Sequence, residues 1–505
     1  MKKDFYLAPI FQDNIIFQAN QSIRIFGKSK IGITIKIEFL SYRYEFKTYK
    51  EEFFFTLAPL SVRCVPFNLK ISSENNTEII KNCLVGDVFY CGGQSNMAFT
   101  VSESENINIE EYDNLRFFEV PKLPYENAEV DFPNLYQKHY AWKLAKADNI
   151  KYFSALAYLM AKDLIKTKDI PIGIISCNMG DTTIFTWIEE EVIKQNPVFN
   201  EVITAYNFEY KKFKSFEDYQ VNFKKQLPLL LKFYDIINDG ASKGLDSKEA
   251  HNRAFSEIPN PFLPMGPLNQ NRPGGLFDVM VKELIPYSFK AFVYYQGESD
   301  KLLYHIYLNA LEAMAKSYRE KFDNYFPVII IQLAGYNYLD VDELAVAILK
   351  DQQLAFQDLA KKQYLVSASD LGERDNIHPK DKSVLAKRIS NVIKEYLYYD
   401  QENSLSPEFK YYIFTGDSVI IKTKNNSLPL VKKSSGYFTG INTEGKTVEL
   451  NDYKIIGNDI HIDITRDIVE IRYAYEHYPN HFIYTTNDLP LLPFRIRIEV
   501  GGISK

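Results

Sequence analysis

Long apolar runs, an excess of one charge and paired cysteines are all missing from this 505-residue sequence. No apolar stretch approaches the ~20 residues that a membrane-spanning helix needs. The apolar stretch that begins at Phe5 is short and contains Pro9, whereas a secretory signal needs a longer uninterrupted one. We therefore expect a cytoplasmic protein that has no membrane partner.

Acidic and basic residues are nearly balanced. The 59 basic and 65 acidic residues give a formal net charge of −6, which leaves no basic surplus for binding nucleic acid. The cysteines show no Cys-x-x-Cys spacing, which argues against a zinc site and against a disulfide framework. They are predicted to be free, buried thiols: Cys64, Cys83, Cys91 and Cys177. We expect no metal and no nucleic-acid partner.

Apolar residues make up 46% of the sequence and aromatic residues 15%, enough to fill several cores. At ~150 residues per domain, the length predicts about three domains. Residues 1–84 alternate between apolar and polar positions, most clearly from Ile31 to Phe39, and predict a small antiparallel β-sandwich. Residues 401–505 return to this alternation and predict a second β domain.

Residues 85–400 combine apolar runs with helical patterns. The apolar runs predict strands at Leu84 to Cys91, Ile172 to Cys177, Ala291 to Tyr295, Val328 to Leu333 and Tyr364 to Ala368. Spacings of three and four residues predict helices at Phe153 to Lys166, Leu302 to Phe322, Val341 to Lys361 and Lys380 to Tyr396. This order predicts an α/β fold with a five-stranded parallel sheet covered on both faces. An insertion at about 188–270 interrupts it.

A glycine-rich turn follows the first of these strands. It reads Gly-Gly-Gln-Ser-Asn-Met over residues 92–97. Glycines permit tight dihedrals, and a sharp turn after a buried strand lifts the next side chain into a cleft. Ser95 is therefore a candidate nucleophile. Serine is also a preferred helix cap, so from these six residues alone a capping role is equally open.

A nucleophilic serine needs a base and a partner that orients the base. Of the seven histidines, only His378 follows an aspartate, Asp375, by three residues, and it lies in the loop after the last predicted parallel strand. Active sites of open α/β sheets lie at the carboxyl ends of strands, so Ser95 and His378 are predicted to meet there. The alternative is that Asp375 and Pro379 only begin the next helix.

Two more strand ends offer donors for the oxyanion of an acyl-transfer reaction. Gly180 follows the second predicted strand and Gln296 follows the third. The backbone N–H groups of Ser95 and Gly180, together with the side-chain amide of Gln296, would form an oxyanion hole with three donors.

Four motifs occur in a characteristic order at residues 86–88, 93–97, 295–299 and 375–379. Together they resemble the sialate O-acetylesterase family of the SGNH hydrolase superfamily, and the resemblance extends over almost the whole chain. It implies a flavodoxin-like α/β/α hydrolase domain at 85–400, flanked by β domains at 1–84 and 401–505. The chain departs from the family pattern at Asp181, where a glycine is usual, which makes the backbone donor there less certain.

The resemblance also implies roles for the residues singled out above. Ser95 would be the nucleophile, His378 the base and Asp375 its partner, while Gly180 and Gln296 would donate to the oxyanion. No cofactor is implied, and the expected partner is an O-acetylated sugar, because family members remove acetyl groups from sialic acids. The residues considered for contact with that sugar are Gln94, Asn96, Glu298 and Trp187, with core packing as an equal alternative for Trp187.

The sequence leaves several alternatives open. An acetyl xylan esterase or a general carbohydrate acetylesterase would use the same triad; an arginine placed for the sialic acid carboxylate would separate them, and Arg253 and Arg272 are candidates. A non-catalytic carbohydrate-binding protein is disfavoured by the intact triad. An interaction scaffold is disfavoured because the insertion shows no heptad pattern. The sugar, the acetyl position and the choice between monomer and homodimer stay open.

Overall fold

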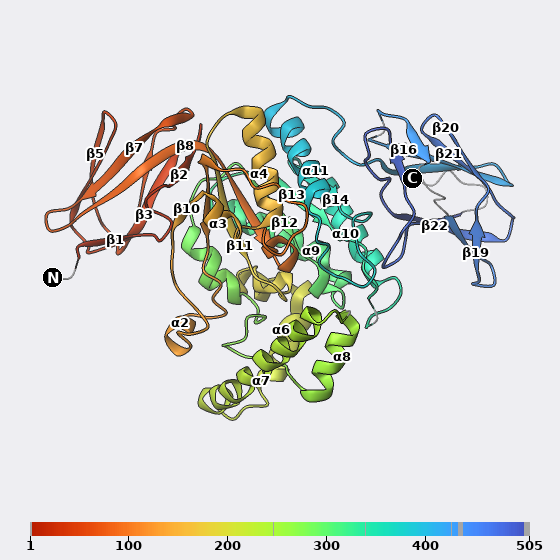
Figure 1. Cartoon of the computed structure of the whole chain (residues 1–505), viewed down its shortest axis with the longest axis horizontal. Coiled ribbons are helices and arrows are strands. Elements are labelled where there is room, and N and C mark those ends of the chain that lie inside the picture. The colour runs from red at the N-terminus through yellow and green to blue at the C-terminus, as the bar shows by residue number, and fades with distance from the viewer. Residues whose placement is uncertain (1–2, 246, 339, 426, 433–437, 499–505) are drawn as a thin grey trace. The chain divides into compact units, whose positions relative to one another are not determined.

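The computed structural model describes residues 3–245, 247–338, 340–425, 427–432 and 438–498 (Figure 1). The chain divides into two compact units. The first comprises Met1–Gln296 and Asn309–Val328, and the second comprises Gly297–Leu308 and Ile329–Lys505.

The N-terminal part of the first unit is built from antiparallel strands. One sheet has the order β1 (Phe5–Leu7), β3 (Ile23–Ser29), β6 (Glu52–Leu57). The other strands are β4 (Thr34–Phe39), β5 (Tyr42–Lys47) and β7 (Arg63–Ser72), and β7 pairs with β8 (Thr77–Gly93). The predicted alternation holds within β4, where Ile35 and Ile37 are fully buried, but Ile31 lies in an exposed turn before it.

Strand β8 continues from this region into a large mixed sheet. In the first unit the order is β10 (Trp142–Ala145), β9 (Tyr112–Glu119), β11 (Ile172–Asn178), β8, β12 (Ala291–Tyr295). All neighbours are parallel except β10, which runs antiparallel to β9. The prediction of a five-stranded parallel sheet is confirmed in part. Its strands are present, but the sheet is larger and mixed, and β9 and β10 were not predicted because charged residues such as Arg116 and Lys143 interrupt their short apolar stretches.

Helices cover these strands. Helix α4 (Ala155–Lys168) packs on β9 and β11, and the Ser154 hydroxyl caps it by accepting from the N–H of Ala157. In the second unit, β13 (Val328–Gln332) neighbours β14 (Gln363–Ser367), and helices α10 (Ala345–Leu359) and α11 (Ser383–Ile393) pack on β14. The region predicted as one helix from Leu302 begins instead with a 3₁₀ turn, and its α-helix α9 is Tyr307–Lys321.

The insertion is helical. It contains α5 (Glu190–Gln195), α6 (Asn200–Tyr210), α7 (Phe216–Ser242) and α8 (Ser247–Glu257), of which α7 and α8 pack against each other (Figure 1). Aromatic and aliphatic side chains of α7 fill a small separate core that includes Tyr219, Phe223 and Leu227. The insertion is therefore a folded element rather than an irregular loop.

The C-terminal part of the second unit is all β, as its alternation predicted. One four-stranded sheet has the order β15 (Glu408–Phe414), β16 (Ser418–Lys424), β21 (Asp459–Asp463), β20 (Tyr453–Ile456). The other has the order β19 (Thr447–Leu450), β18 (Phe438–Asn442), β22 (Ile468–Tyr473), β24 (Phe494–Arg497). A pair, β17 (Leu430–Lys432) and β23 (Ile483–Thr485), completes it. Their inward side chains form one apolar core.

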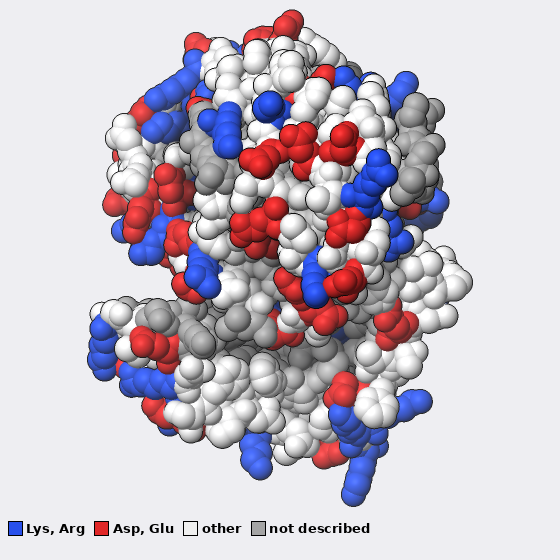
Figure 2. Space-filling model, turned by 90° about the vertical axis from the view of Figure 1, so that its right-hand side faces the viewer, with Lys and Arg blue, Asp and Glu red and all other residues white. Residues whose placement is uncertain are grey.

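The surface agrees with the balanced composition. On the face drawn in Figure 2, basic and acidic side chains are interspersed. Within the described ranges, no helix is both long enough and apolar enough to cross a membrane. All four cysteines are unpaired. Cys64 is exposed, contrary to the expectation of burial, because it lies with the exposed residues 65 and 66 where the pairing of β7 with β8 is irregular.

Candidate active site

Three parallel strands end side by side around the candidate nucleophile. Gly93, the last residue of β8, pairs in register with the last residue of β11 and with the last residue of β12. The segments that follow these strands carry Ser95, Gly180 and Gln296. A Cβ placed on Gly180 would lie 3.4 Å from the Cβ of Ser95. The first unit therefore brings the predicted nucleophile and the predicted oxyanion donors to one edge of the sheet.

Two glycines let β8 turn sharply at this edge. A Cβ on Gly93 would lie 2.0 Å from the carbonyl oxygen of Tyr295, and its φ of +134° is one that other residues rarely adopt. A Cβ on Gly92 would lie 2.8 Å from the ring of Phe292. The turn is then fixed by the N–H of Gln94, which donates to the Tyr295 carbonyl over 3.1 Å. Close approach of β12 thus explains the glycine pair.

Ser95 is the first residue of a four-residue helix, α1 (Ser95–Ala98), and the residue at its N-cap is Gln94. The capping alternative therefore does not apply to Ser95. Ser95 is partly exposed, whereas Gln94 and Asn96 are each only 1% exposed. Burial favours a role for Gln94 and Asn96 in holding the turn over direct contact with a sugar.

The turn that carries Gly180 is braced by the Pro- and Asn-rich loop at 259–273. The side-chain amide of Gln270 donates to the Gly180 carbonyl over 3.3 Å, and that of Asn271 donates to the Asp181 carbonyl over 2.8 Å. The Asn271 side-chain oxygen accepts from the N–H of Thr183 over 3.0 Å. Asp181 has a φ of 56°, in the left-handed region that aspartate tolerates, so it can occupy a position where glycine is usual.

Thr182 organises the same turn from inside. Its carbonyl accepts from the side-chain amide of Gln296 over 3.0 Å, and its hydroxyl accepts from the indole N–H of Trp187 over 3.1 Å. The amide of Gln296 is thereby oriented, and because an amide carries two N–H groups, this contact uses one of them. Trp187 is only 1% exposed, so its ring has no face open to a sugar. The structure supports core packing for Trp187 rather than sugar stacking.

His378 and Asp375 lie in the second unit, in the loop that follows β14. Asn376 shapes this loop: its side-chain oxygen accepts from the N–H of His378 over 3.1 Å, and its amide donates to the His378 carbonyl and to Glu373, each over 2.9 Å. His378 is half-buried and Asp375 is exposed. Ser95 belongs to the other unit, so its pairing with His378 stays a prediction.

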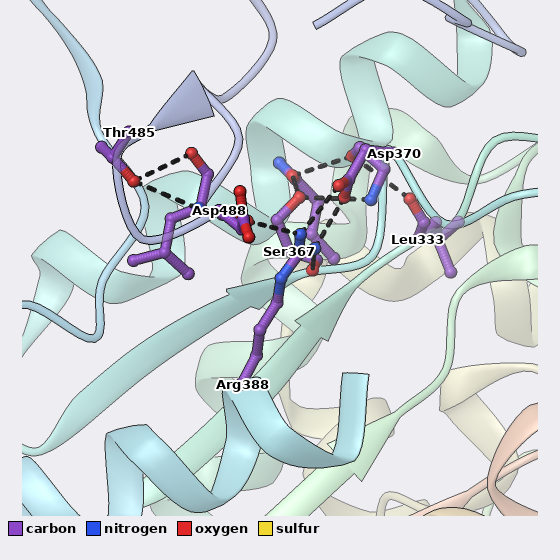
Figure 3. A network of polar contacts seen from close by, with 9 residues as sticks. Leu333, Ser367, Asp370, Arg388, Thr485 and Asp488 are labelled. Atoms are coloured by element: carbon purple, nitrogen blue, oxygen red, sulfur yellow. Dashed lines mark hydrogen bonds and ion pairs between the residues drawn. The ribbon is translucent and has the colours of Figure 1, made fainter. Parts of the chain in front are cut away.

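A buried ion pair holds the start of this loop. Arg388 of α11 donates from its two terminal nitrogens to the two carboxylate oxygens of Asp370, over 2.6 and 2.8 Å. It also donates to the carbonyls of Ser367 and Asp488, each over 3.0 Å. Figure 3 shows the guanidinium reaching these groups from α11. The loop with His378 therefore begins at a fixed point eight residues before the histidine.

Glu298 lies in the short turn Glu298–Asp300 and is 7% exposed. It is electrostatically coupled to Lys382, which is 2% exposed and follows the His378 loop. Burial lowers the pKa of Lys382 to about 8, and the negative charge of Glu298 opposes that lowering. Glu298 thus helps to keep a buried ammonium charged, which favours a supporting role over contact with a sugar.

Comparisons with known proteins found a shared fold and similar sequences. A crystal structure of a carbohydrate acetylesterase from Xanthomonas citri shares the fold, with a TM-score of 0.76 over 97% of this chain and 99% of that chain, at 19% identity. Sialate O-acetylesterase of Mus musculus is 25% identical over 347 residues, and that of Rattus norvegicus is 25% identical over 349. This chain is related to the sialate O-acetylesterases. No family model matches it.

The sequence match has defined limits. The match covers 63% of this chain and 58% of each rodent protein. The chain thus spans less than two thirds of the length of the curated proteins it matches. The resemblance noted in the motifs is confirmed as a resemblance, and the roles of individual residues stay predictions.

The residues that hold the loops of the candidate site in place were not identified from the sequence. Gln270 and Asn271 brace the Gly180 turn from 90 residues away in the chain, and Arg388 anchors the His378 loop. The unusual length and composition of the 259–273 loop was a signal that it has a function. No local pattern indicated which turn it contacts.

Proposed function

We propose that this chain is a serine esterase that hydrolyses O-acetyl esters of sialic acids and releases acetate. The observation that carries the proposal is the juxtaposition of Ser95 with Gly180 and Gln296 at three neighbouring strand ends. A partly exposed serine beside two sources of N–H donors suits acyl transfer. Similarity to the sialate O-acetylesterases supports an acetylated sugar as the substrate.

The reaction proceeds through an acetyl-enzyme. The Ser95 oxygen attacks the acetyl carbonyl carbon while His378 accepts the hydroxyl proton, and the electron pair of the carbonyl bond moves to its oxygen. The N–H groups of Ser95 and Gly180 and the Gln296 amide donate to that oxyanion. When the tetrahedral intermediate collapses, the bond to the sugar oxygen breaks and His378 protonates the leaving sugar.

Water then completes the cycle. His378 accepts a proton from water, the resulting hydroxide attacks the acetyl-enzyme, and a second oxyanion forms in the same hole. Collapse breaks the bond to Ser95, which takes the proton back from His378 and releases acetate. Asp375 is assigned to orient the imidazole and to stabilise its cationic form during both halves.

Acetate release from a substrate panel tests the proposal. The panel contains O-acetylated sialic acids and acetylated xylo-oligosaccharides, assayed with the parent protein, with Ser95→Ala and with the matched surface variant Ser102→Ala. We expect release from the sialic acids to disappear only in Ser95→Ala, with unchanged circular dichroism. Comparable turnover of both substrate classes would indicate a general carbohydrate acetylesterase. Full activity in Ser95→Ala would refute the assignment of the nucleophile.

A further inference from the structure

The second unit contains a cavity that shares a wall with the His378 loop. Its volume is about 630 Å³, within the range of roughly 300–1,000 Å³ that is usual for small-molecule sites. Three parts of the unit line it: four residues after β13, Arg374 in the His378 loop, and four residues between β22 and β23. The first set is Asn337, Tyr338, Val341 and Glu343, and the last is Glu476, His477, Tyr478 and Asn480. Arg374 is four residues before His378, so one loop serves both the cavity and the predicted base.

Backbone contacts fix these three walls to one another. The N–H of Asn337 donates to the Arg374 carbonyl over 3.0 Å, and the N–H of Tyr336 donates to the His477 carbonyl over 3.1 Å. Gly372 lies so close to Gly335 that a Cβ on it would be 2.0 Å from the Gly335 carbonyl oxygen. The cavity is thus a formed feature of the unit.

The ring of His477 adds a further tie. Its Nδ1 lies 3.1 Å from the Tyr338 carbonyl oxygen, and its Nε2 lies 2.9 Å from the Asp342 carbonyl oxygen. Both contacts reach the segment that forms the first wall. His477 therefore ties the first wall at Tyr338 and at Asp342, which favours a preformed cavity.

The lining has the chemistry of a sugar site. Aromatic rings offer flat apolar faces, while amides and carboxylates offer partners for hydroxyl groups. The residues that supply these groups are Tyr478, Asn337, Asn480, Glu343 and Glu476. Two carboxylates would by themselves repel an anionic ligand, so recognition of one would depend on the cation that shares the cavity.

That cation is Arg374. The side chain is exposed, and among the residues that the structure describes its guanidinium has no ion pair and no hydrogen bond. The arginines considered from the sequence differ in this respect. Arg253 pairs with Asp239 over 2.9 Å, and Arg272 pairs with Asp278 over 2.9 Å. Both of those guanidinium groups already have carboxylate partners within the first unit.

We propose that Arg374 binds the carboxylate of an acidic sugar and that this cavity is the subsite for that sugar. The inference rests on the proposed function and names the residue and the cavity that would recognise the carboxylate of its substrate. A guanidinium can engage a carboxylate through two parallel N–H donors, which adds direction to the attraction. The neighbouring Glu343 and Glu476 would then accept from sugar hydroxyls.

A matched pair of substrates isolates this contact. One is an O-acetylated sialic acid, and the other is its methyl ester at the carboxyl group, which adds one methyl group and removes the charge. The readout is acetate release, expressed as the ratio of kcat/KM for the acid to kcat/KM for the ester. We expect Arg374→Met to lower this ratio about fivefold, the upper end of what an exposed charged pair contributes. Arg374→Lys should retain part of it.

The control is Arg253→Met, which removes the same charge from the insertion and should leave the ratio unchanged. If Arg374→Met shifts the ratio less than twofold while the parent protein still releases acetate, the subsite is refuted and the esterase proposal stands. An equal shift in Arg253→Met would also refute it, since a general field effect would then suffice. If the parent protein hydrolyses neither substrate, the esterase proposal itself fails.

Discussion

Breaking the ion pair between Arg388 and Asp370 should lower the free energy of unfolding of the second unit more than breaking most of its other ion pairs. The side chains are 6% and 3% exposed, and two N–H···O contacts of 2.6 and 2.8 Å join them. Arg388→Met removes the guanidinium with little change in length. Asp370 is then left as a carboxylate that has lost its buried counter-ion, and the carbonyls of Ser367 and Asp488 each lose a donor.

The expected magnitude follows from that burial. Removing one partner of a buried pair costs about 3–5 kcal/mol, because the remaining charge is desolvated without compensation. Arg388→Met should therefore lower the free energy of unfolding of the second unit by about 3–5 kcal/mol. Replacing both partners, as in Arg388→Met with Asp370→Leu, should restore most of this loss, because no buried charge then remains.

Hydrogen exchange measured by mass spectrometry suits this test. The only tryptophans, Trp142 and Trp187, lie in the first unit, so tryptophan fluorescence would not report on the second. Exchange in peptides from β14 and α11 gives the local free energy of opening. Lys446→Met is the control: Lys446 and Glu444 are 2.8 Å apart but 74% and 65% exposed, and exposed pairs contribute about 0–1 kcal/mol. A loss below about 1 kcal/mol in Arg388→Met would refute the reasoning.

Two further predictions concern the first unit. Gly93→Ala places a Cβ against the Tyr295 carbonyl and should displace Ser95, so acetate release is expected to fall about 100-fold. The control is Gly416→Ala, at a position where φ is +98° and the surrounding space is open. Equal acetate release by the two variants would contradict the prediction. Burial raises the pKa of Glu119 to about 7 from an ordinary 4.5. Between pH 4.5 and about 7 the folded state keeps a proton on Glu119 that the unfolded state has lost, so the free energy of unfolding should fall as pH rises. Urea titrations at pH 5 and 8 measure this fall, which Glu119→Gln should reduce. An equal fall in Glu119→Gln would contradict the prediction.

The sequence predicted those parts of the fold that local pattern determines. Apolar runs located the strands that end at Ser95, Gly180 and Gln296, because a buried parallel strand is apolar on both faces. Strands β9 and β10 were not predicted, because a charged residue, Arg116, interrupts the apolar pattern of β9. In the folded chain its guanidinium is buried and donates to the backbone carbonyls of Asn14 and Asn82. A charge that folding buries and pairs cannot be distinguished from a surface charge by periodicity.

The candidate site divides in the same way. Its nucleophile and oxyanion donors were predicted because each follows a strand that the apolar pattern makes visible. The proposed substrate contacts were not predicted from the sequence. Trp187 was considered because of its position in the motif, yet it is buried and its indole N–H donates to the Thr182 hydroxyl. Arg374 was not considered, because an unpaired guanidinium beside a cavity can be recognised only after the chain is folded.

Strand β8 limits where this chain can be divided. Its 17 residues belong first to the N-terminal sheet, through β7, and then to the sheet edge that carries Ser95. The short strand β2 (Ile16–Gln18) also pairs, in parallel, with residues 84–86 in the middle of β8. A truncation or gene fusion at residue 84 would cut a continuous strand rather than a linker. The N-terminal β region therefore shares a strand with the segment that carries the candidate nucleophile, and the two cannot be separated without breaking that strand.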